Sequence, residues 1–469
     1  MKNLFLFIMF YLASFSVLSQ SNWKSFNTEN GLDGNYARKH LVCKSGDVWL
    51  LTGHTVNIYD GNVWKNIDQI TDTVTGEQVV FEDIMYMNED PSEHVWLGTK
   101  TGLIEYDGKQ WQFHREQWNK RFGWQGFTIK YYSMDAQGYI WAFLEKFELF
   151  PRDFTQKWTI GLMYRFNGTE WEIYPGMAGR TAMRTLEKNK HFKQFFTDKY
   201  KNFWVLTYNG FRIWNGENWQ IYNGVKQTEL DCQVTDNDGN IWLGNKYGLQ
   251  SYNGSEWTTY KKKNGLAADW VYFLYVDDKN RIWAFTKSHN YNVFRGLSFY
   301  QDNKWTSYNF EKDGFVFPIY SANSPGDGNF WIGGENGVSV FDGNSWQTYT
   351  TNNGLLKGKY NWIIKDRNDH IWACSDNKYL QKLEEDTWNP VFVTESDDEA
   401  WWYNYRFKDS TGNIWLGVNN KGIYKFDGDN WSRYTKEDVL ASNTIKHIFE
   451  DKQENIWVIT ENGVSVCFK

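Results

Sequence analysis

One tryptophan recurs at a nearly constant interval along almost the whole sequence. It follows a large apolar residue, in the phrase Ile-Trp-Leu-Gly or a variant of it, and we call it the anchor tryptophan. The ten copies lie 38 to 63 residues apart, at Trp49, Trp96, Trp141, Trp204, Trp242, Trp283, Trp331, Trp372, Trp415 and Trp457. A period near forty residues is typical of a repeat fold. Ten such units fill the chain and leave no room for a second large domain.

Each unit predicts four short strands. In the unit around Trp242, apolar runs cover residues 241–244, 249–252, 256–260 and 270–276, separated by turns rich in Gly, Asn and Asp. Two-residue Asn-Gly and Asp-Gly turns are strong hairpin signals. Four short strands per unit are the pattern of one β-propeller blade. The sequence therefore predicts an all-β fold, a single β-propeller of ten four-stranded blades over residues 20–469.

The two ends of the chain predict how the propeller closes. The last unit stops before its outer tryptophan strand, whereas residues 22–32 read like an outer strand and its loop, as in 345–355. The strand that contains Trp23 is expected to complete the last blade and close the ring, which removes an exposed sheet edge. Two five-bladed rings would use the same ten units. A single ring is favoured because no linker separates the fifth and sixth units.

The N-terminus indicates an exported protein, and the charge balance argues against a nucleic-acid partner. Lys2, the apolar stretch 4–17 and the small residues before position 20 predict a secretory signal peptide over residues 1–19. The mature chain contains no further apolar run of membrane-spanning length. With 50 Lys plus Arg against 57 Asp plus Glu, it lacks the basic excess typical of nucleic-acid binders. We expect a periplasmic or secreted protein with no nucleic-acid partner.

The four cysteines do not predict a disulfide framework. Cys43, Cys232, Cys374 and Cys467 occupy different positions of the repeat. Free thiols are therefore expected. Cys467 takes a place that Tyr or Phe holds in other units, and we expect it to be buried in the core.

An aspartate stands six residues before most anchor tryptophans. Only Cys43 and Pro325 break this pattern, and the aspartates are Asp90, Asp135, Asp198, Asp236, Asp277, Asp366, Asp409 and Asp451. An aspartate in a turn can accept hydrogen bonds from backbone N–H groups. The phrase at 236–240 faintly resembles a calcium loop, but most copies lack the further carboxylates that Ca²⁺ needs. No phosphate loop, nucleophile elbow or metal-binding helix motif occurs, so we expect no metal or cofactor and assign no catalytic residue.

The repeated phrase resembles the two-component-regulator propeller repeat of Bacteroidota proteins, D-x-x-G-N-I-W-L-G followed by G-L-x-x-Y-D-G-x-x-W. The resemblance covers essentially the whole mature chain. In that family the propeller usually forms the periplasmic part of a hybrid sensor, often one that responds to polysaccharides. The resemblance implies a blade fold and a binding role, with a membrane-bound signalling partner as one candidate. It covers the propeller part only, because no immunoglobulin-like domain, transmembrane helix or kinase sequence is present.

The candidate binding face is the one at which the innermost strand of each blade begins. Aromatic residues stand there thirteen or fourteen positions before the anchor tryptophan, and several cations stand eleven positions before it. Aromatic faces stack on sugar rings, and cations pair with carboxylate or sulfate groups; the alternative is that the aromatics pack between blades. The aromatic entrance residues are Tyr36, Phe127, Trp270, Phe317, Trp401 and Trp402. The residues eleven positions back include Arg38, Lys130, Lys193, Asp231, Tyr272, Tyr320 and Lys446.

Two units carry long segments between their second and third strands, at 143–160 and 287–295. Long loops on a rigid scaffold often carry function. We expect the third unit and its neighbour to make the main ligand contacts, with Trp124 or Trp158 as the stacking platform and Lys130 as an anion partner. The members of this dense group are Trp124, Phe127, Lys130, Lys146, Arg152, Trp158 and Lys193.

These observations predict an exported propeller that binds a glycan or another extracellular polymer, anionic polymers included, without transforming it. One alternative is a propeller enzyme that acts on polysaccharide, a lyase or a glycosidase, for which a cleft with convergent carboxylates or a Tyr, His and Arg group would be evidence. The other is a protein–protein interaction scaffold, for which a broad apolar patch would be evidence.

Overall fold

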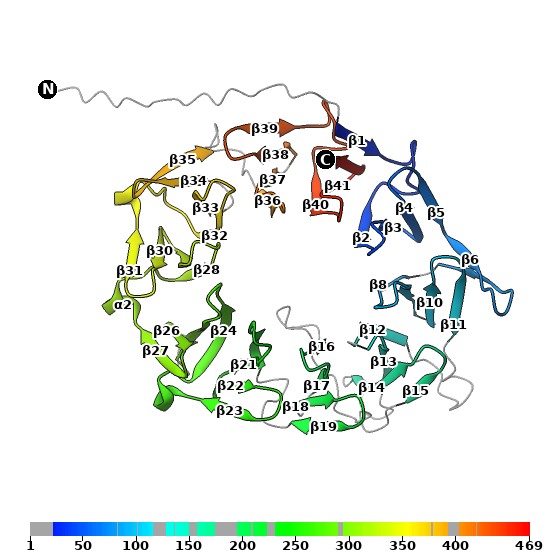
Figure 1. The fold of residues 1–469 in the computed structure, drawn as a ribbon, viewed down its shortest axis with the longest axis horizontal. Helices are drawn as coiled ribbons and strands as arrows, with labels where there is room; N and C mark the ends of the chain where they lie inside the picture. The colour runs from blue at the N-terminus through cyan, green and yellow to red at the C-terminus, as the bar shows by residue number, and fades with distance from the viewer. Residues whose placement is uncertain are drawn as a thin grey trace. The chain divides into compact units, whose positions relative to one another are not determined.

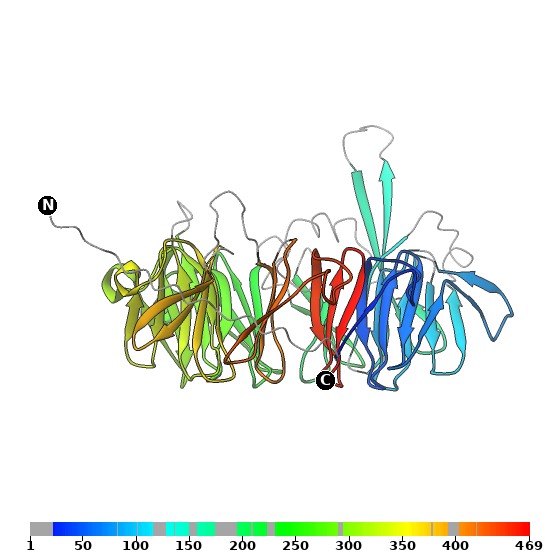
Figure 2. The ribbon, with the colours of Figure 1, turned by 90° about the horizontal axis from the view of Figure 1, so that it is seen from above.

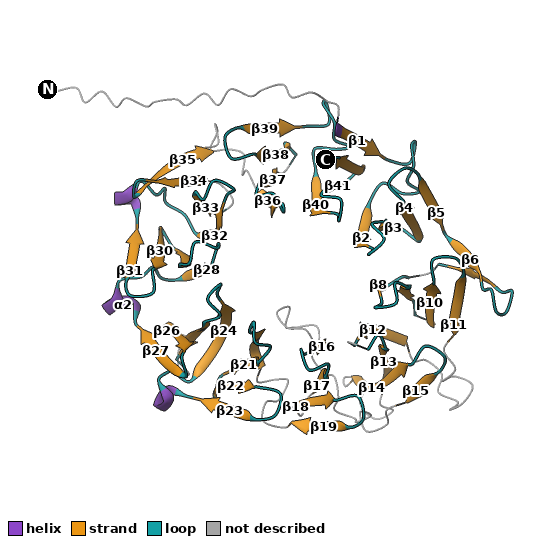
Figure 3. Cartoon of the chain, in the orientation of Figure 1, coloured by secondary structure: helices purple, strands orange, loops and turns teal. Residues whose placement is uncertain are grey.

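The structure, a computed structural model, describes residues 22–469 except 82, 101, 116–127, 136, 150–156, 174–194, 208–209, 223–229, 289–293, 377–378, 393–402 and 419. Ten four-stranded antiparallel sheets hold almost all of the described strands, and helical segments are short (Figures 1 and 3). The chain is an all-β propeller of ten blades, as predicted. Local turn chemistry explains this agreement, because Asn-Gly and Asp-Gly pairs mark most of the hairpins between the third and fourth strands of the blades.

The chain divides into two compact units. The first comprises residues 1–42, 46–66 and 351–469 and holds blades 8, 9, 10 and 1. Blade 1 contains β2 (Ala37–Val42), β3 (Val48–Thr52), β4 (Thr55–Tyr59) and β5 (Trp64–Ile67), and blade 8 contains β32 (Tyr360–Lys365), β33 (Ile371–Ser375), β34 (Tyr379–Glu384) and β35 (Thr387–Phe392). Blade 9 contains β36 (Tyr403–Lys408), β37 (Ile414–Val418), β38 (Gly422–Phe426) and β39 (Trp431–Tyr434). Blade 10 contains β40 (Ile445–Glu450), β41 (Ile456–Thr460), β42 (Gly463–Cys467) and β1 (Trp23–Phe26), and the short helix η5 (Thr351–Asn353) precedes blade 8.

The second unit comprises residues 43–45 and 67–350 and holds blades 2 to 7. Blade 2 contains β8 (Tyr86–Glu89), β9 (Val95–Gly98), β10 (Gly102–Tyr106) and β11 (Trp111–Arg115), and blade 3 contains β12 (Thr128–Met134), β13 (Ile140–Leu149), β14 (Lys157–Phe166) and β15 (Trp171–Ile173). Blade 4 contains β16 (Phe195–Thr197), β17 (Phe203–Thr207), β18 (Gly210–Trp214) and β19 (Trp219–Tyr222), and blade 5 contains β20 (Leu230–Thr235), β21 (Ile241–Asn245), β22 (Gly248–Tyr252) and β23 (Trp257–Tyr260). Blade 6 contains β24 (Trp270–Val276), β25 (Ile282–Lys287), β26 (Phe294–Gln301) and β27 (Lys304–Tyr308), and blade 7 contains β28 (Ile319–Asn323), β29 (Phe330–Gly334), β30 (Gly337–Phe341) and β31 (Trp346–Tyr349). A hairpin of β6 (Gln69–Thr71) and β7 (Gln78–Val80) precedes blade 2, and the helices η4 (Lys262–Asn264) and α2 (Phe310–Asp313) follow β23 and β27.

The N-terminal strand β1 completes blade 10, as the sequence predicts. It pairs antiparallel with β42, with Trp23 opposite Cys467 and Phe26 opposite Val464. Cys467 is half-buried rather than fully buried, so the expectation of a core position is wrong for this residue. No disulfide joins any of the four cysteines, which all lie in the described part of the chain.

The packing between blades rules out two five-bladed rings. In the first unit, Trp457 of blade 10 and Tyr59 of blade 1 belong to one buried apolar cluster. In the second unit, Trp242 of blade 5 and Trp305 of blade 6 belong to another. Two consecutive rings would instead pack blade 5 on blade 1 and blade 10 on blade 6. The alternative of two five-bladed rings is therefore wrong.

The anchor tryptophans fill the spaces between neighbouring blades. All ten are at most 4% exposed. Trp283 of blade 6, for example, stacks on Phe330 of blade 7 with ring centroids 3.9 Å apart. Removing rings of this size from water is the main apolar contribution to the packing of the blades.

The aspartate of the repeat fixes both its own turn and the anchor indole. Asp236 Oδ1 accepts the backbone N–H of Asn240 at 2.7 Å, and its Oδ2 accepts the indole N–H of Trp242 at 2.9 Å. The same indole bond recurs at 2.7 to 2.9 Å in the other seven units that have this aspartate. In blade 7 the acceptor is Oδ2 of Asp327, which stands only four residues before Trp331. Its distance from the indole nitrogen is 2.7 Å. The carboxylates are thus engaged in structural hydrogen bonds.

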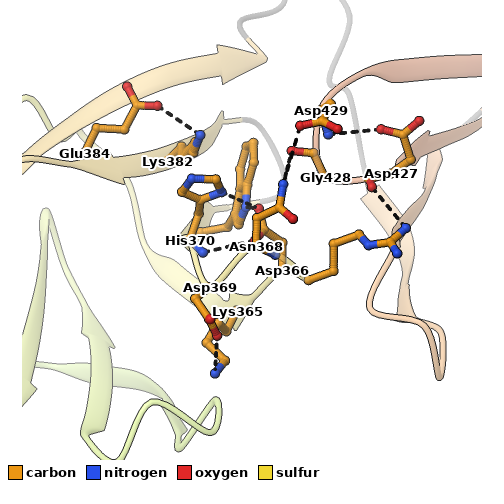
Figure 4. Close-up of polar contacts among 12 residues, drawn as sticks. Lys365, Asp366, Asn368, Asp369, His370, Lys382, Glu384, Asp427, Gly428 and Asp429 are labelled. Atoms are coloured by element: carbon orange, nitrogen blue, oxygen red, sulfur yellow. Dashed lines mark hydrogen bonds and ion pairs between the residues drawn. The ribbon is translucent and has the colours of Figure 1, made fainter.

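Blade 8 shows a variant of this turn (Figure 4). His370 Nδ1 lies 3.0 Å from Asp366 Oδ2, where other blades place an asparagine amide. Asn368 Nδ2 then reaches out to the carbonyl oxygen of Gly428 in blade 9 at 3.0 Å. In blade 8 the turn therefore also ties the blade to blade 9.

Two hairpins depart from the expected pattern. Residues 143–160 were expected to form a long loop, but β13 and β14 continue as ten-residue strands that stay paired as far as Leu149 opposite Lys157. Figure 2 shows this hairpin standing out from the blades beside it. The β6–β7 hairpin was not expected at all; its Thr73 N–H donates to the carbonyl oxygen of Trp111 at 3.1 Å.

Candidate functional site

In the part of the chain that the structure describes, eight blades carry a β-bulge near the start of their first strand. The bulged residue stands eleven positions before the anchor tryptophan in every case. These residues are Arg38, Lys130, Asp231, Tyr272, Tyr320, Asn361, Asn404 and Lys446. A bulge bends its strand and re-aims the side chain, and bulges are frequent beside functional sites. The position that the sequence singled out is thus a structural feature of the blade.

The bulged side chain can reach the turn between the second and third strands of its own blade. Arg38 Nη2 donates to the carbonyl oxygen of Gly53 at 2.6 Å. Tyr320 Oη donates to Glu335 Oε2 at 2.8 Å. In both pairs the partner follows fifteen residues after the bulge, because antiparallel pairing brings these two positions to the same end of the blade. We call this end, where the first strand begins, the entrance edge.

Blades 5 and 6 bring four side chains together at their entrance edges. Trp270, at the start of β24, donates its indole N–H to Oδ2 of Asp231, the bulged residue of β20, at 2.7 Å. Lys287, at the end of β25, places Nζ 4.2 Å from the centroid of the Trp270 ring and 4.9 Å from that of Tyr272. We call these four residues the Trp270 cluster. It combines a carboxylate, an ammonium group, an indole and a phenol.

Burial shapes the ionisation of the Trp270 cluster. It raises the pKa of Asp231, while the indole N–H of Trp270 and the charges of Lys287 and Lys246 act in the opposite direction. Burial also raises the pKa of Tyr272 to about 12. The phenol therefore keeps its proton at neutral pH and can donate a hydrogen bond.

Blade 7 adds aromatic side chains beside this cluster. Phe317, which leads into β28, stacks on Phe294 of β26 with ring centroids 4.9 Å apart and on Phe310 of α2 with centroids 4.8 Å apart. Phe317 and the bulged Tyr320 both remain substantially exposed. The aromatic character of the entrance edge thus continues from blade 6 to blade 7.

A different group lies on the first strands of blades 10 and 1, in the other unit. His40 of β2 stacks on Phe449 of β40 with ring centroids 4.0 Å apart, and its ring lies 4.9 Å from that of His447. Tyr36, which precedes β2, is exposed. Sequence reasoning missed the two histidines, because they come from opposite ends of the chain and only the pairing of blades 10 and 1 brings them together.

The structure brings some predicted site residues together and leaves others undescribed. Trp270 and Tyr272 share the Trp270 cluster, whereas Tyr36 and Arg38 lie in blade 1. Lys130, Lys146 and Trp158 lie on β12, β13 and β14 as backbone positions only. The predicted residues outside the described part of the chain are Trp124, Phe127, Arg152, Lys193, Trp401 and Trp402.

The described side chains also bear on metal binding and membrane insertion. Within the described ranges, no group of three or more His, Cys, Asp or Glu side chains is placed to hold a metal ion. Among those residues, no helix has the length and apolarity to cross a bilayer.

Comparison with known families supports the repeat assignment. The model of the two-component regulator propeller family matches residues 439–462, the segment that contains β40 and β41. The chain therefore carries the repeat that its sequence resembles. No curated protein matches the sequence.

Several solved structures are similar to the chain. The extracellular domains of two hybrid two-component systems from B. thetaiotaomicron match with 18% and 16% identity and TM-scores of 0.35 and 0.30. These matches cover 96% and 94% of this chain and 64% of each domain, so the chain spans less than two thirds of their length. PorZ, a surface component of the type-IX secretion system of Porphyromonas gingivalis, matches with 11% identity and a TM-score of 0.36, covering 90% of this chain and 67% of PorZ. Likeness at this level carries no inference about ligand or activity.

Proposed function

We propose that this chain, a ten-bladed β-propeller that carries the two-component regulator propeller repeat, is an exported binding protein that recognises a glycan at the entrance edges of its blades. The predicted signal peptide over residues 1–19 supports export to the periplasm or beyond. In this proposal the protein acts as a sensor or capture module, and a membrane-bound signalling protein is its candidate partner.

The observation that carries the proposal is the Trp270 cluster. An indole ring offers a flat apolar face for the C–H groups of a sugar ring, while Asp231 and Tyr272 offer an acceptor and a donor for its hydroxyl groups. Ligand sites in general combine apolar or aromatic surface with a few placed polar groups. Three blade elements, β20, β24 and β25, hold these groups, so the site rests on strands rather than on a long loop.

The partners of the described cations favour a neutral glycan over a polyanion. Lys287 already faces the Trp270 and Tyr272 rings. Arg38 donates to a backbone carbonyl, and Lys446 Nζ lies 4.0 Å from Glu461 Oε2. A bound anion would have to compete with these contacts.

A polysaccharide panel tests the proposal. Purified protein is screened for binding to neutral and anionic glycans, and the same mixtures are assayed for new reducing ends and for unsaturated products. We expect binding to at least one neutral glycan without product release. Release of product would support the enzyme alternative. Absence of binding to every glycan, together with capture of a defined protein partner, would support the scaffold alternative.

Variants of the Trp270 cluster locate the site. Trp270→Ala removes the stacking face, and an aromatic platform is worth ~1–3 kcal/mol in measured nucleobase cases. Affinity should therefore fall about ten- to hundred-fold, and Trp270→Phe should recover part of it. Tyr200→Ala is the control, because Tyr200 is also exposed but belongs to an aspartate turn of blade 4. If Trp270→Ala binds like the parent while Trp124→Ala or Trp158→Ala does not, the site lies in the third unit instead.

A further inference from the structure

Exposed aromatic side chains concentrate in three consecutive blades. Among the described residues, six Tyr or Phe side chains are strongly exposed, and four of these belong to blades 5 to 7. These four are Tyr247, Phe273, Phe317 and Tyr320, with exposed fractions of 50%, 42%, 37% and 41%. Exposed apolar residues that lie close together mark a binding site, whereas single exposed residues are common on any surface.

These side chains come from elements that lie side by side. The indole of Trp270 joins blade 6 to blade 5 through Asp231. The stacking of Phe317 on Phe294 joins blade 7 to blade 6. Tyr247 lies in the turn between β21 and β22, and the neighbouring Lys246 places Nζ 4.7 Å from its ring centroid. Direct side-chain contacts therefore join the entrance edges of blades 5, 6 and 7.

Each of the three blades pairs an aromatic ring with a polar group. Blade 5 offers Tyr247 beside Lys246. Blade 6 offers Trp270, Tyr272 and Lys287, and blade 7 offers Phe317 with the Tyr320–Glu335 hydrogen bond. A ring beside a polar group is the elementary unit for recognising one sugar, and here the unit is repeated by the blade architecture.

We infer that the entrance edges of blades 5, 6 and 7 bind one linear neutral oligosaccharide, with successive sugars on successive blades. The inference rests on the proposed function and names its ligand class. Packed sheets lie about 10 Å apart, so platforms on three blades extend over about 20 Å, more than a monosaccharide can cover. The chain length of the glycan is thus part of what the site recognises.

The experiment is a titration with oligosaccharide ladders. Malto-, cello-, xylo- and manno-oligosaccharides of one to eight units are titrated into the full chain by calorimetry. We expect affinity to rise about ten- to hundred-fold between the mono- and hexasaccharide of the ladder that binds, and to level off beyond it.

Variants at the blade 7 end of the surface separate this inference from the proposed function. Phe317→Ala and Tyr320→Ala should weaken the hexasaccharide about tenfold or more and leave the shortest bound member unchanged. Glu335→Gln with Tyr320→Phe removes the polar contact but keeps the rings, and it covers the case in which Phe317→Ala fails to fold. Tyr200→Ala serves as the control. Length-independent affinity that still depends on Trp270 would overturn the inference and leave the proposed function standing, whereas no binding by any ladder or panel glycan would overturn both.

Discussion

At the residue scale, the bond between the anchor indole and an aspartate oxygen is the polar contact that recurs most regularly in the propeller. Asp236 is buried, and it accepts a backbone N–H, the Asn240 amide and the Trp242 indole. Buried donors left without an acceptor are costly, and hydrogen bonds to a charged group contribute about 1.5–3 kcal/mol each. This explains why the aspartate recurs in most units.

Replacing this carboxylate should destabilise the protein measurably. Asp236→Ala leaves three donors without their acceptor, so we expect a loss of about 3 kcal/mol or more and an apparent melting temperature lowered by several degrees. Asp238→Ala is the control, because Asp238 lies in the same turn but is exposed and receives only the Asn280 amide. Equal melting temperatures for the two variants, measured by calorimetry, would contradict this role.

The residue scale also shows where pattern reading fails. Pro325 interrupts the six-residue spacing in blade 7, yet Asp327 still reaches Trp331. A fixed spacing cannot reveal this, because the indole needs an acceptor at a point in space rather than at a position in the chain. The bulge is the opposite case. The eleven-residue spacing predicts the bulged positions correctly, because the bulge is a feature of the backbone that recurs at the same place in each of these blades.

At the element scale, the histidine contact between the first strands of blades 10 and 1 makes the stability of the fold depend on pH. Burial and the neighbouring His447 lower the pKa of His40 to about 4, and burial lowers that of His447. Histidine in the unfolded chain titrates near 6.5. The unfolded state therefore binds more protons than the folded state between about pH 6.5 and 4, and stability falls as the pH drops through this window.

A single substitution tests this acid sensitivity. His40→Phe keeps the stacking on Phe449 without a titrating ring, so its melting temperature should fall less than that of the parent between pH 7 and 4.5. His54→Gln is the control, because His54 is exposed in the turn of blade 1. If His40→Phe and the parent lose the same number of degrees on acidification, the histidine contact is not responsible.

Strands were predictable where turn chemistry is local. The expected strands 241–244 and 270–276 match β21 and β24 closely, because turns rich in Gly, Asn and Asp lie between the strands of these units. The extension of β13 and β14 into ten-residue strands was not predictable. It depends on the two segments pairing with each other, and residues 143–149 carry no local signal that distinguishes a strand from a long apolar loop.

At the scale of the whole molecule, the two ends of the chain meet in one blade. In repeat proteins, stability is approximately a sum of unit and nearest-neighbour terms, so an incomplete blade weakens its neighbours first. β1 supplies Trp23, which packs on Tyr434 of blade 9 with ring centroids 4.9 Å apart, and Phe26, which packs on Trp64 of blade 1 at 5.4 Å. One strand of four residues thus contacts the blades on both sides of its own.

Contacts between blades are the part of the site that the sequence does not predict. The blade count and the closing strand follow from the repeat, but the Trp270 cluster requires knowing that blade 5 faces blade 6 at one edge. The repeat places Asp231 only among the residues that stand eleven positions before an anchor tryptophan. Its bond to Trp270 crosses between blades, and no spacing within a unit encodes such a contact.

Deleting residues 21–27 should therefore open the propeller at blade 10. The deletion exposes the edge of β42 and uncovers Val464 and Val466, which are fully buried; truncation of one buried Phe or Trp alone costs about 3–5 kcal/mol. We expect aggregation or a large drop in melting temperature. Hydrogen exchange should rise first in β40–β42 and β2–β5, and later or not at all in β24–β27, which lie in the other unit. Lys24→Ser is the control, because Lys24 is the exposed position of the same strand. A deletion variant that melts like the parent, with unchanged exchange in β42, would show that β1 is dispensable and that the closure of blade 10 does not depend on it.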